Sequence, residues 1–260
     1  MYIKPYDELT IQDNFIFQKV MRNKRICKQT IERLLDIDIK DISYPEEEKS
    51  INVRLDSKSI RLDVYVNDDK GTVFNIEMQT TKDMDELVKR ARYYQGLIDI
   101  DNIEKGQNYS ALHDTYIIFI CTFGVFTGKR HKYTFRNLCI EDNEILLNDG
   151  TTKLFLSTKG EADDVSKPLK MFLDYVDGKK PKDALMQEID HEVDTVKHCD
   201  EWRRDYMTLA LEMDKKWREG KAEGKIEAIR NAIKDGLTTL AAVKKSGRYT
   251  EEEIAAIAAP

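Results

Sequence analysis

The sequence predicts an α/β protein with a mixed central sheet between helices, followed by a helical C-terminal tail. Residues 60–79 alternate apolar and polar side chains on both sides of a turn-forming segment, which is typical of an antiparallel hairpin of half-buried strands. Residues 83–98 repeat apolar side chains at helical spacing, and the run 114–126 is apolar enough for a buried strand. A helix between these strands provides the crossover that brings the last strand into the hairpin's sheet.

Composition describes a soluble globular protein on the charged side. The 260 residues are 41% hydrophobic and 35% charged, with a net charge of −6. Residues 215–260 carry ten Lys or Arg against seven Asp or Glu, a net +3, which leaves −9 for residues 1–214. So acidic a body argues against bulk nucleic-acid binding, but it allows an acidic metal site that meets phosphate through an ion or a few local cations.

Three observations lead us to expect a cytoplasmic protein without a membrane partner. The first ten residues lack a basic-then-apolar export pattern. The longest apolar run, residues 116–126, is too short to cross a bilayer. The four cysteines have no CxxC spacing, which favours reduced thiols.

The remaining elements follow in chain order. Thr10 is expected to cap a helix that reaches Met21, and a second helix is expected over 25–36. Residues 38–50 are predicted to be extended, and residues 50–55 to form a first strand. Beyond the buried strand, weaker strand signals occupy 132–140, 145–148 and 152–156. Helices are predicted over 168–176 and over 182–211, the second broken near 191–199.

The hairpin brings two carboxylates to one face of the sheet. If Asn67 pairs with Val73, Asp63 lies opposite Glu77, with Cβ atoms about 5 Å apart; a slip of two residues gives roughly 7–8 Å. Like charges so placed are destabilising unless a cation lies between them, and Mg²⁺ is a suitable one because it accepts one or two carboxylates. Gln79 projects from the same face and is able to orient a water. A solvated sheet face with ordinary acidic residues is the open alternative.

The C-terminal tail has its own pattern. Residues 218–225 repeat a Glu-Gly-Lys unit inside a helix expected to end at Gly236. Two short helices follow, the second opened by a capping box of Thr250 and Glu253. These helices fit either a helix-turn-helix DNA reader or an arm for self-association, and the acidic start of the last helix favours the arm.

Four segments in a fixed order resemble a known family: Asp13–Phe17, Arg61–Val64, Asn75–Gln79 and Arg90–Tyr94. Their order and spacing resemble the PD-(D/E)XK nuclease superfamily. More narrowly, they resemble the Rpn family of recombination-promoting nucleases, also described as PD-(D/E)XK nuclease family transposases. The resemblance covers roughly residues 1–230. It implies a restriction-endonuclease-like αβββαβ core over 1–160, a helical extension over 161–214 and the tail over 215–260.

The resemblance also implies an activity, that of a Mg²⁺-dependent DNA endonuclease linked to recombination or mobile elements, with Mn²⁺ as the alternative ion. Asp63 and Glu77 would be metal ligands together with the backbone carbonyl of Met78. Gln79 stands where the superfamily more often has lysine, and a glutamine orients without supplying charge. A catalytically silent relative that binds DNA or a partner is therefore the alternative function.

Two further sets of residues complete the predicted site. Glu32 matches an acidic position that many superfamily members use, and Asp13 is its lower-ranked competitor. The helix over 83–98 carries the predicted DNA contacts, on faces away from its apolar stripe: Lys89, Arg90, Arg92 and Tyr93. Basic residues on an exposed helix also serve simply to solvate it. The expected partners are DNA and a second copy bound through the tail.

Overall fold

The computed structural model describes residues 2–44, 50–51 and 60–259 of the chain. Contacts divide the chain into two compact units, residues 7–199 and a unit that joins residues 1–6 to residues 200–260. Each unit is described by itself. The finer division predicted from the sequence, into segments that meet near residues 160 and 214, remains a proposal.

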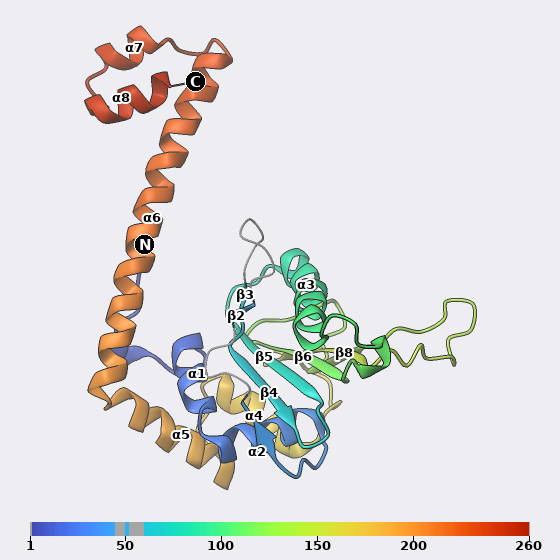
Figure 1. The fold of residues 1–260 in the computed structure, drawn as a ribbon. Coiled ribbons are helices and arrows are strands. Elements are labelled where there is room, and N and C mark those ends of the chain that lie inside the picture. The colour runs from blue at the N-terminus through green and yellow to red at the C-terminus, as the bar shows by residue number, and fades with distance from the viewer. Residues whose placement is uncertain (1, 45–49, 52–59, 260) are drawn as a thin grey trace. The chain divides into compact units, whose positions relative to one another are not determined.

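A six-stranded mixed sheet forms the centre of the larger unit (Figure 1). In spatial order its strands are β1 (Ile42–Ser43), β4 (Val64–Asp68), β5 (Val73–Gln79), β6 (Thr115–Cys121), β8 (Thr151–Ser157) and β7 (Lys132–Phe135). Strands β5, β6 and β8 are parallel, whereas β1, β4 and β7 pair antiparallel with their neighbours. The predicted mixed sheet with a crossover helix is therefore confirmed.

Most helices of this unit begin at side chains that accept hydrogen bonds from the first helical turn. The helices are α1 (Asn14–Met21), α2 (Lys24–Leu35), α3 (Met84–Asn102), α4 (Lys167–Val176) and α5 (Ala184–Lys197), with 3₁₀ turns at Tyr6–Glu8 and Tyr109–Ala111. Asn23, Asp83, Ser166 and Asp183 accept from backbone N–H groups at the starts of α2, α3, α4 and α5, whereas α1 has no such side-chain cap. Such caps satisfy donors that the helix itself leaves unpaired.

The polar face of the hairpin is buried by α3. Tyr65 of β4 and Phe119 of β6 pack in one cluster with Leu87, Ala91 and Tyr94 of α3. The expectation of half-buried strands is therefore wrong, because most residues of β4 and β5 are buried whichever face they occupy. Polar residues of this face consequently need partners inside the protein.

Three boundaries differ from the predictions. The first helix begins at Asn14 rather than just after Thr10. The strand expected over 60–66 is interrupted at Leu62 and Asp63, which leaves β3 (Ile60–Arg61) to pair with β2 (Ser50–Ile51) outside the main sheet. The rest of the strand predicted over 50–55 lies outside the described residues. On the side away from β5, β4 pairs with β1, which lies within the segment 38–50, predicted only to be extended.

The smaller unit is built on α6 (Asp200–Lys234), which has no buried residue in its 35 residues. Its C-terminal part packs with α8 (Glu251–Ala258), which also contacts α7 (Leu240–Lys245) and has the predicted capping box of Thr250 and Glu253. The N-terminal segment belongs to this unit because the Tyr206 hydroxyl donates to the Lys4 carbonyl at 2.6 Å. Among the described residues, no helix is both long and apolar enough to cross a membrane.

Candidate active site at the β4–β5 hairpin

The hairpin register places the two predicted carboxylates together. Asn67 pairs with Val73 and Val64 pairs with Ile76, so the closer of the two predicted registers is confirmed. Asp63 lies directly before β4, one residue beyond the Val64–Ile76 pair, and thus faces Glu77. The two acidic residues therefore converge across neighbouring strands.

Side chains replace the backbone ladder at this point. The Asp63 backbone N–H donates to Oε1 of Glu77 at 3.2 Å, and the Met78 N–H donates to Oδ2 of Asp63 at 3.1 Å. Each carboxylate thus holds the backbone of the opposite strand, which explains why regular strand pairing stops at Asp63. The exchange fixes both carboxylates in one place.

Burial decides between the two interpretations of these acidic residues. Glu77 is only 2% exposed and its neighbour Asn75 is fully buried, so this is not a solvated sheet face. Burial raises the pKa of Glu77 well above its ordinary value, and the negative charge of Asp63 raises it further. Hydrogen bonds from the Asp63 backbone and Asn75, with the charge of Arg90, act in the opposite direction without cancelling the increase. The two carboxylates therefore repel each other when both are ionised.

Helix α1 supplies further contacts to Asp63. The Gln18 amide Nε2 donates to Oδ1 of Asp63 at 2.8 Å, and Asn14 Nδ2 approaches the same oxygen at 3.5 Å. A neutral amide that donates to a carboxylate fixes its orientation without neutralising it. Sequence reasoning missed both residues, since contacts 45 and 49 residues apart along the chain leave no local signal.

Helix α3 supplies a cation from the other side. Arg90 Nη1 donates to Oε1 of Gln79 at 3.0 Å, and its Nη2 lies 3.6 Å from Oε2 of Glu77. The Tyr94 hydroxyl accepts from Nη2 at 2.9 Å. Burial, followed by the charge of Glu77, raises the pKa of Tyr94, so this hydroxyl stays protonated.

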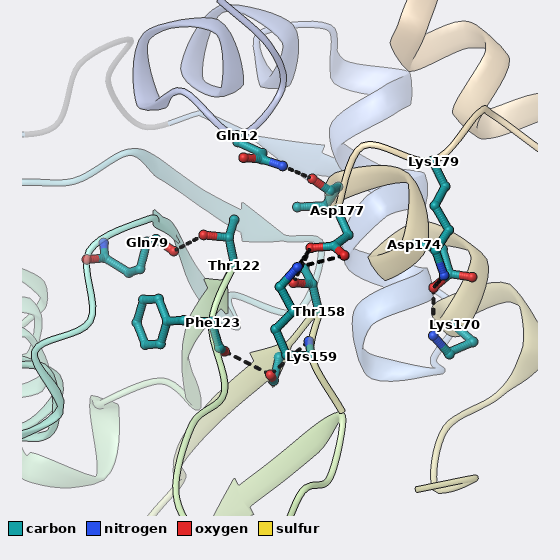
Figure 2. Close-up of polar contacts among 12 residues, drawn as sticks. Gln12, Gln79, Thr122, Phe123, Thr158, Lys159, Lys170, Asp174, Asp177 and Lys179 are labelled. Atoms are coloured by element: carbon teal, nitrogen blue, oxygen red, sulfur yellow. Dashed lines mark hydrogen bonds and ion pairs between the residues drawn. The ribbon is translucent and has the colours of Figure 1, made fainter. Parts of the chain in front are cut away.

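The end of β5 is joined to the neighbouring strands by short polar contacts, shown in Figure 2. The Gln79 carbonyl accepts from the Thr122 N–H at 3.0 Å and from the Thr122 hydroxyl at 3.5 Å, while the Gln79 side chain accepts from Arg90. Farther along this edge, Lys159 donates to both carboxylate oxygens of Asp177, and Thr158 donates to one of them. The first contact joins the ends of β5 and β6, and the contacts to Asp177 join the end of β8 to the end of α4.

The other predicted site residues lie in different surroundings. Oε1 of Glu32 accepts from Lys28 at 2.6 Å and from the Ile39 N–H at 2.9 Å, and Asp13 accepts from Thr10. Among the residues that the structure describes, no hydrogen bond or ion pair links Glu32 to Asp63 or Glu77.

The predicted DNA contacts on α3 divide into two groups. Lys89, Arg92 and Tyr93 are exposed, whereas Arg90 turns toward the sheet. The expectation that Arg90 lies away from the apolar stripe is therefore wrong. Positions 87, 90, 91 and 94 share one helical face, and this spacing could have revealed the orientation from the sequence.

Comparison with protein families agrees with this geometry. Residues 14–158 match the family model described as PD-(D/E)XK nuclease family transposase. The chain belongs to this family. The matched range runs from the start of α1 to the end of β8 and so contains the whole candidate site. Searches of curated proteins and of solved structures found no match.

For a PD-(D/E)XK nuclease family transposase, the open question is the fit of a divalent metal. Among the described residues, no group of three or more His, Cys, Asp or Glu could hold an ion. A pair of carboxylates nevertheless fits Mg²⁺, which takes one or two protein carboxylates and completes its shell with water and substrate phosphate. The raised pKa of Glu77 is independent support, because a cation beside it would relieve the repulsion by Asp63.

Proposed function

We propose that this chain is a metal-dependent DNA endonuclease that hydrolyses phosphodiester bonds in recombination or mobile-element biology. The observation that carries the proposal is the buried Glu77, held against Asp63 by reciprocal hydrogen bonds, with a pKa raised by burial and by the charge of Asp63. A protein has little reason to bury such a pair unless a cation joins it. Family membership supports the reaction class.

Asp63, Glu77 and the backbone carbonyl of Met78 would hold Mg²⁺, with Mn²⁺ as a substitute. The ion would lower the pKa of water and offset the negative charge that develops on the phosphate. Gln18 keeps the Asp63 carboxylate oriented, and the Met78 N–H donates to its other oxygen. These two neutral donors thus orient both oxygens of the Asp63 carboxylate.

Exposed residues of α3 would contact the DNA backbone beside this pair. Lys89, Arg92 and Tyr93 are all exposed on that helix, and contacts to phosphate fix position without reading sequence. Glu32 is assigned to the catalytic set by the sequence alone, and that assignment stays a prediction.

Cleavage of supercoiled plasmid tests the proposal. The wild-type chain is incubated with Mg²⁺, Mn²⁺ or Ca²⁺ beside Asp63→Ala, and we expect Mg²⁺ or Mn²⁺ to support nicking that Asp63→Ala abolishes. Asp174→Asn is the matched control, because Asp174 is a buried carboxylate already paired with Lys170 and Lys179. Nicking that survives in Asp63→Ala would mean that another site does the chemistry.

The alternative function is a catalytically silent member of the family that binds DNA or a partner. Gln79 favours it, because a neutral amide cannot supply the charge of a lysine. Metal-independent DNA binding by a chain that never nicks DNA would support this alternative and refute the endonuclease.

We further propose that α6 mediates self-association. Large apolar side chains are exposed along it, including Met207, Leu211 and Trp217, at 57%, 70% and 43%. Exposed apolar side chains on one helix are typical of a partner surface. Light scattering should show an oligomer that Leu211→Glu dissociates and the nearby Lys215→Glu leaves intact, whereas a monomeric wild-type chain at all concentrations would refute the proposal.

A further inference from the structure

Arg90 occupies a position on α3 that a solvating cation would avoid. Its side chain is 28% exposed, whereas Lys89 and Arg92 on either side are exposed residues. It follows Leu87 by three residues and precedes Tyr94 by four, so it lies on the face that packs against the sheet. Moving a guanidinium out of water is costly, so its placement calls for a reason.

The guanidinium is held in one orientation by rings and by hydrogen bonds. Its central carbon lies 5.4 Å from the ring centroid of Tyr94 and 6.0 Å from that of Phe119. The Nε and Nη2 groups donate to the Tyr94 hydroxyl at 3.3 and 2.9 Å, and Nη1 donates to Gln79 at 3.0 Å. A planar fork fixed in this way is already ordered for an oxyanion ligand.

Donors remain on the side of the guanidinium that faces the carboxylates. Arginine carries five N–H groups, of which one on Nε, one on Nη1 and one on Nη2 have the acceptors just named. For the other two, the contacts among the described residues give no hydrogen-bond acceptor, and Oε2 of Glu77 at 3.6 Å is an ion-pair contact. A phosphate oxygen beside Glu77 would therefore find both donors and a full positive charge.

Hydrolysis of a phosphodiester needs such a charge. The water oxygen forms a bond to phosphorus, one ester P–O bond breaks, the water gives up a proton, and the leaving oxygen takes one up. Negative charge concentrates on the phosphoryl oxygens as this happens, and fixed donors stabilise it. Gln79 is neutral and cannot supply this charge, but its amide oxygen accepts a hydrogen bond from the charged guanidinium of Arg90.

We propose that Arg90 is a catalytic residue that donates N–H hydrogen bonds to the scissile phosphate, and that Gln79 and Tyr94 are positioning residues that hold it there. The inference rests on the endonuclease function proposed above. Arg90 stays protonated throughout and takes no part in proton transfer. Gln79 and Arg90 thus act together: Arg90 on α3 contributes the cation, and Gln79 on β5 positions it.

Steady-state cleavage separates this role from ordinary DNA binding. Arg90→Gln is expected to lower kcat about 100-fold with KM changed less than about threefold, because the contact is weak in the bound ground state and strengthens as charge develops in the transition state. The matched control is Arg92→Gln on the exposed face of the same helix, expected to raise KM and leave kcat within about twofold. Equal effects of the two variants on KM alone would reduce Arg90 to a backbone contact and overturn the inference.

Relocating the charge is the sharper test. Gln79→Lys combined with Arg90→Gln places a lysine on β5 in place of the arginine on α3, and kcat should return to within about tenfold of wild type. Tyr94→Phe keeps the ring and removes the hydroxyl, and should lower kcat about tenfold, as expected for a hydrogen bond to a charged group. If the double variant is no more active than Arg90→Gln and Tyr94→Phe is fully active, the inference fails.

A measurement without metal or turnover completes the test. In EDTA, Arg90→Gln should reduce the slope of log affinity for a DNA duplex against log salt concentration by about one, the amount for one lost phosphate contact. An unchanged slope overturns the inference whatever the rates are. A wild-type chain that never cleaves DNA refutes the endonuclease and this inference together, whereas cleavage lost in Asp63→Ala but kept in Arg90→Gln refutes the inference alone.

Discussion

Glu77 and Asp174 are both buried carboxylates of the same unit, yet their surroundings differ. Asp174 is 8% exposed and accepts hydrogen bonds from Lys170 at 2.6 Å and Lys179 at 2.9 Å (Figure 2). Burial alone would raise the pKa of Asp174, but the two lysines outweigh it and the pKa is lowered. Glu77 has a second carboxylate beside it and one arginine at 3.6 Å, and its pKa is raised. Burial alone therefore does not distinguish the two acids, whereas the balance of charge around each of them does.

The largest expected effect is that two isosteric variants change different properties: Glu77→Gln the cleavage rate and Asp174→Asn the stability. Glu77→Gln should lower cleavage about a thousandfold or more, since losing about 4 kcal/mol of transition-state stabilisation has that effect on rate. Asp174→Asn should cleave at the wild-type rate but lose about 1–2 kcal/mol of unfolding free energy, because its lysine contacts weaken. Plasmid nicking and urea unfolding of the two variants measure both quantities, and a wild-type rate in Glu77→Gln would remove the distinction between the acids.

A smaller effect is expected at Gln18, which touches Asp63 but no other predicted ligand. Gln18→Leu should weaken Mn²⁺ affinity about tenfold, the lower end for residues that orient a metal ligand. Gln12→Leu is the control, because Gln12 lies in the same segment and donates to the Val176 carbonyl instead. Titration calorimetry should give equal Mn²⁺ affinity for Gln12→Leu and wild type; equal affinity for Gln18→Leu as well would contradict the orienting role.

Opposite pH dependence is expected from the two acids when EDTA removes metal. The folded-state pKa of Glu77 is raised above 4.5, so its stabilising contribution is present below that pH and is lost as pH rises above it. The folded-state pKa of Asp174 is lowered below 3.8, so its contribution is present above that pH and is lost as pH falls. In urea unfolding, the unfolding free energy of Glu77→Gln should therefore increase relative to that of wild type as pH rises from 4.5. The unfolding free energy of Asp174→Asn should be lower than that of wild type at neutral pH, and this difference should shrink in acid. The same slope for both variants would show that the two environments do not differ.

The smallest effect on catalysis is expected at Glu32. Its Oε1 accepts from Lys28 and from the Ile39 backbone, contacts that close the end of α2. Glu32→Gln should cost about 1 kcal/mol of stability and change nicking less than about threefold. A fall of tenfold or more, with the fold intact by circular dichroism, would support the metal-site role that the sequence assigns.

The sequence allowed most of the fold and the two carboxylates to be predicted. A turn at residues 67–71 sets the hairpin register, and alternation then determines which side chains share a face. Asn75 was within reach of the same reasoning, since it lies on the face of Glu77 and, with its amide nitrogen turned that way, donates to Oε1 at 3.2 Å. Local periodicity therefore carried the prediction as far as one pair of strands.

Tertiary contacts limited the rest. The alternation of β4 and β5 predicted a solvent-exposed face of the sheet, because the pattern of a single strand does not show that α3 covers that face. Gln18 reaches Asp63 only through the packing of α1 at the end of the hairpin. Arg90 was placed on an outer face because arginine is usually exposed, although its spacing from Leu87 and Tyr94 indicates the opposite.

The N-terminal segment has a practical consequence. Residues 1–6 belong with α6, where the ring of Tyr6 lies 5.6 Å from that of Tyr206 and 4.8 Å from the Arg203 guanidinium. The nuclease unit is therefore an insert, connected at both its first and last residues to the same neighbour. A version shortened at Cys199 should also begin at Asp7, because the six residues before it would lose their docking partner.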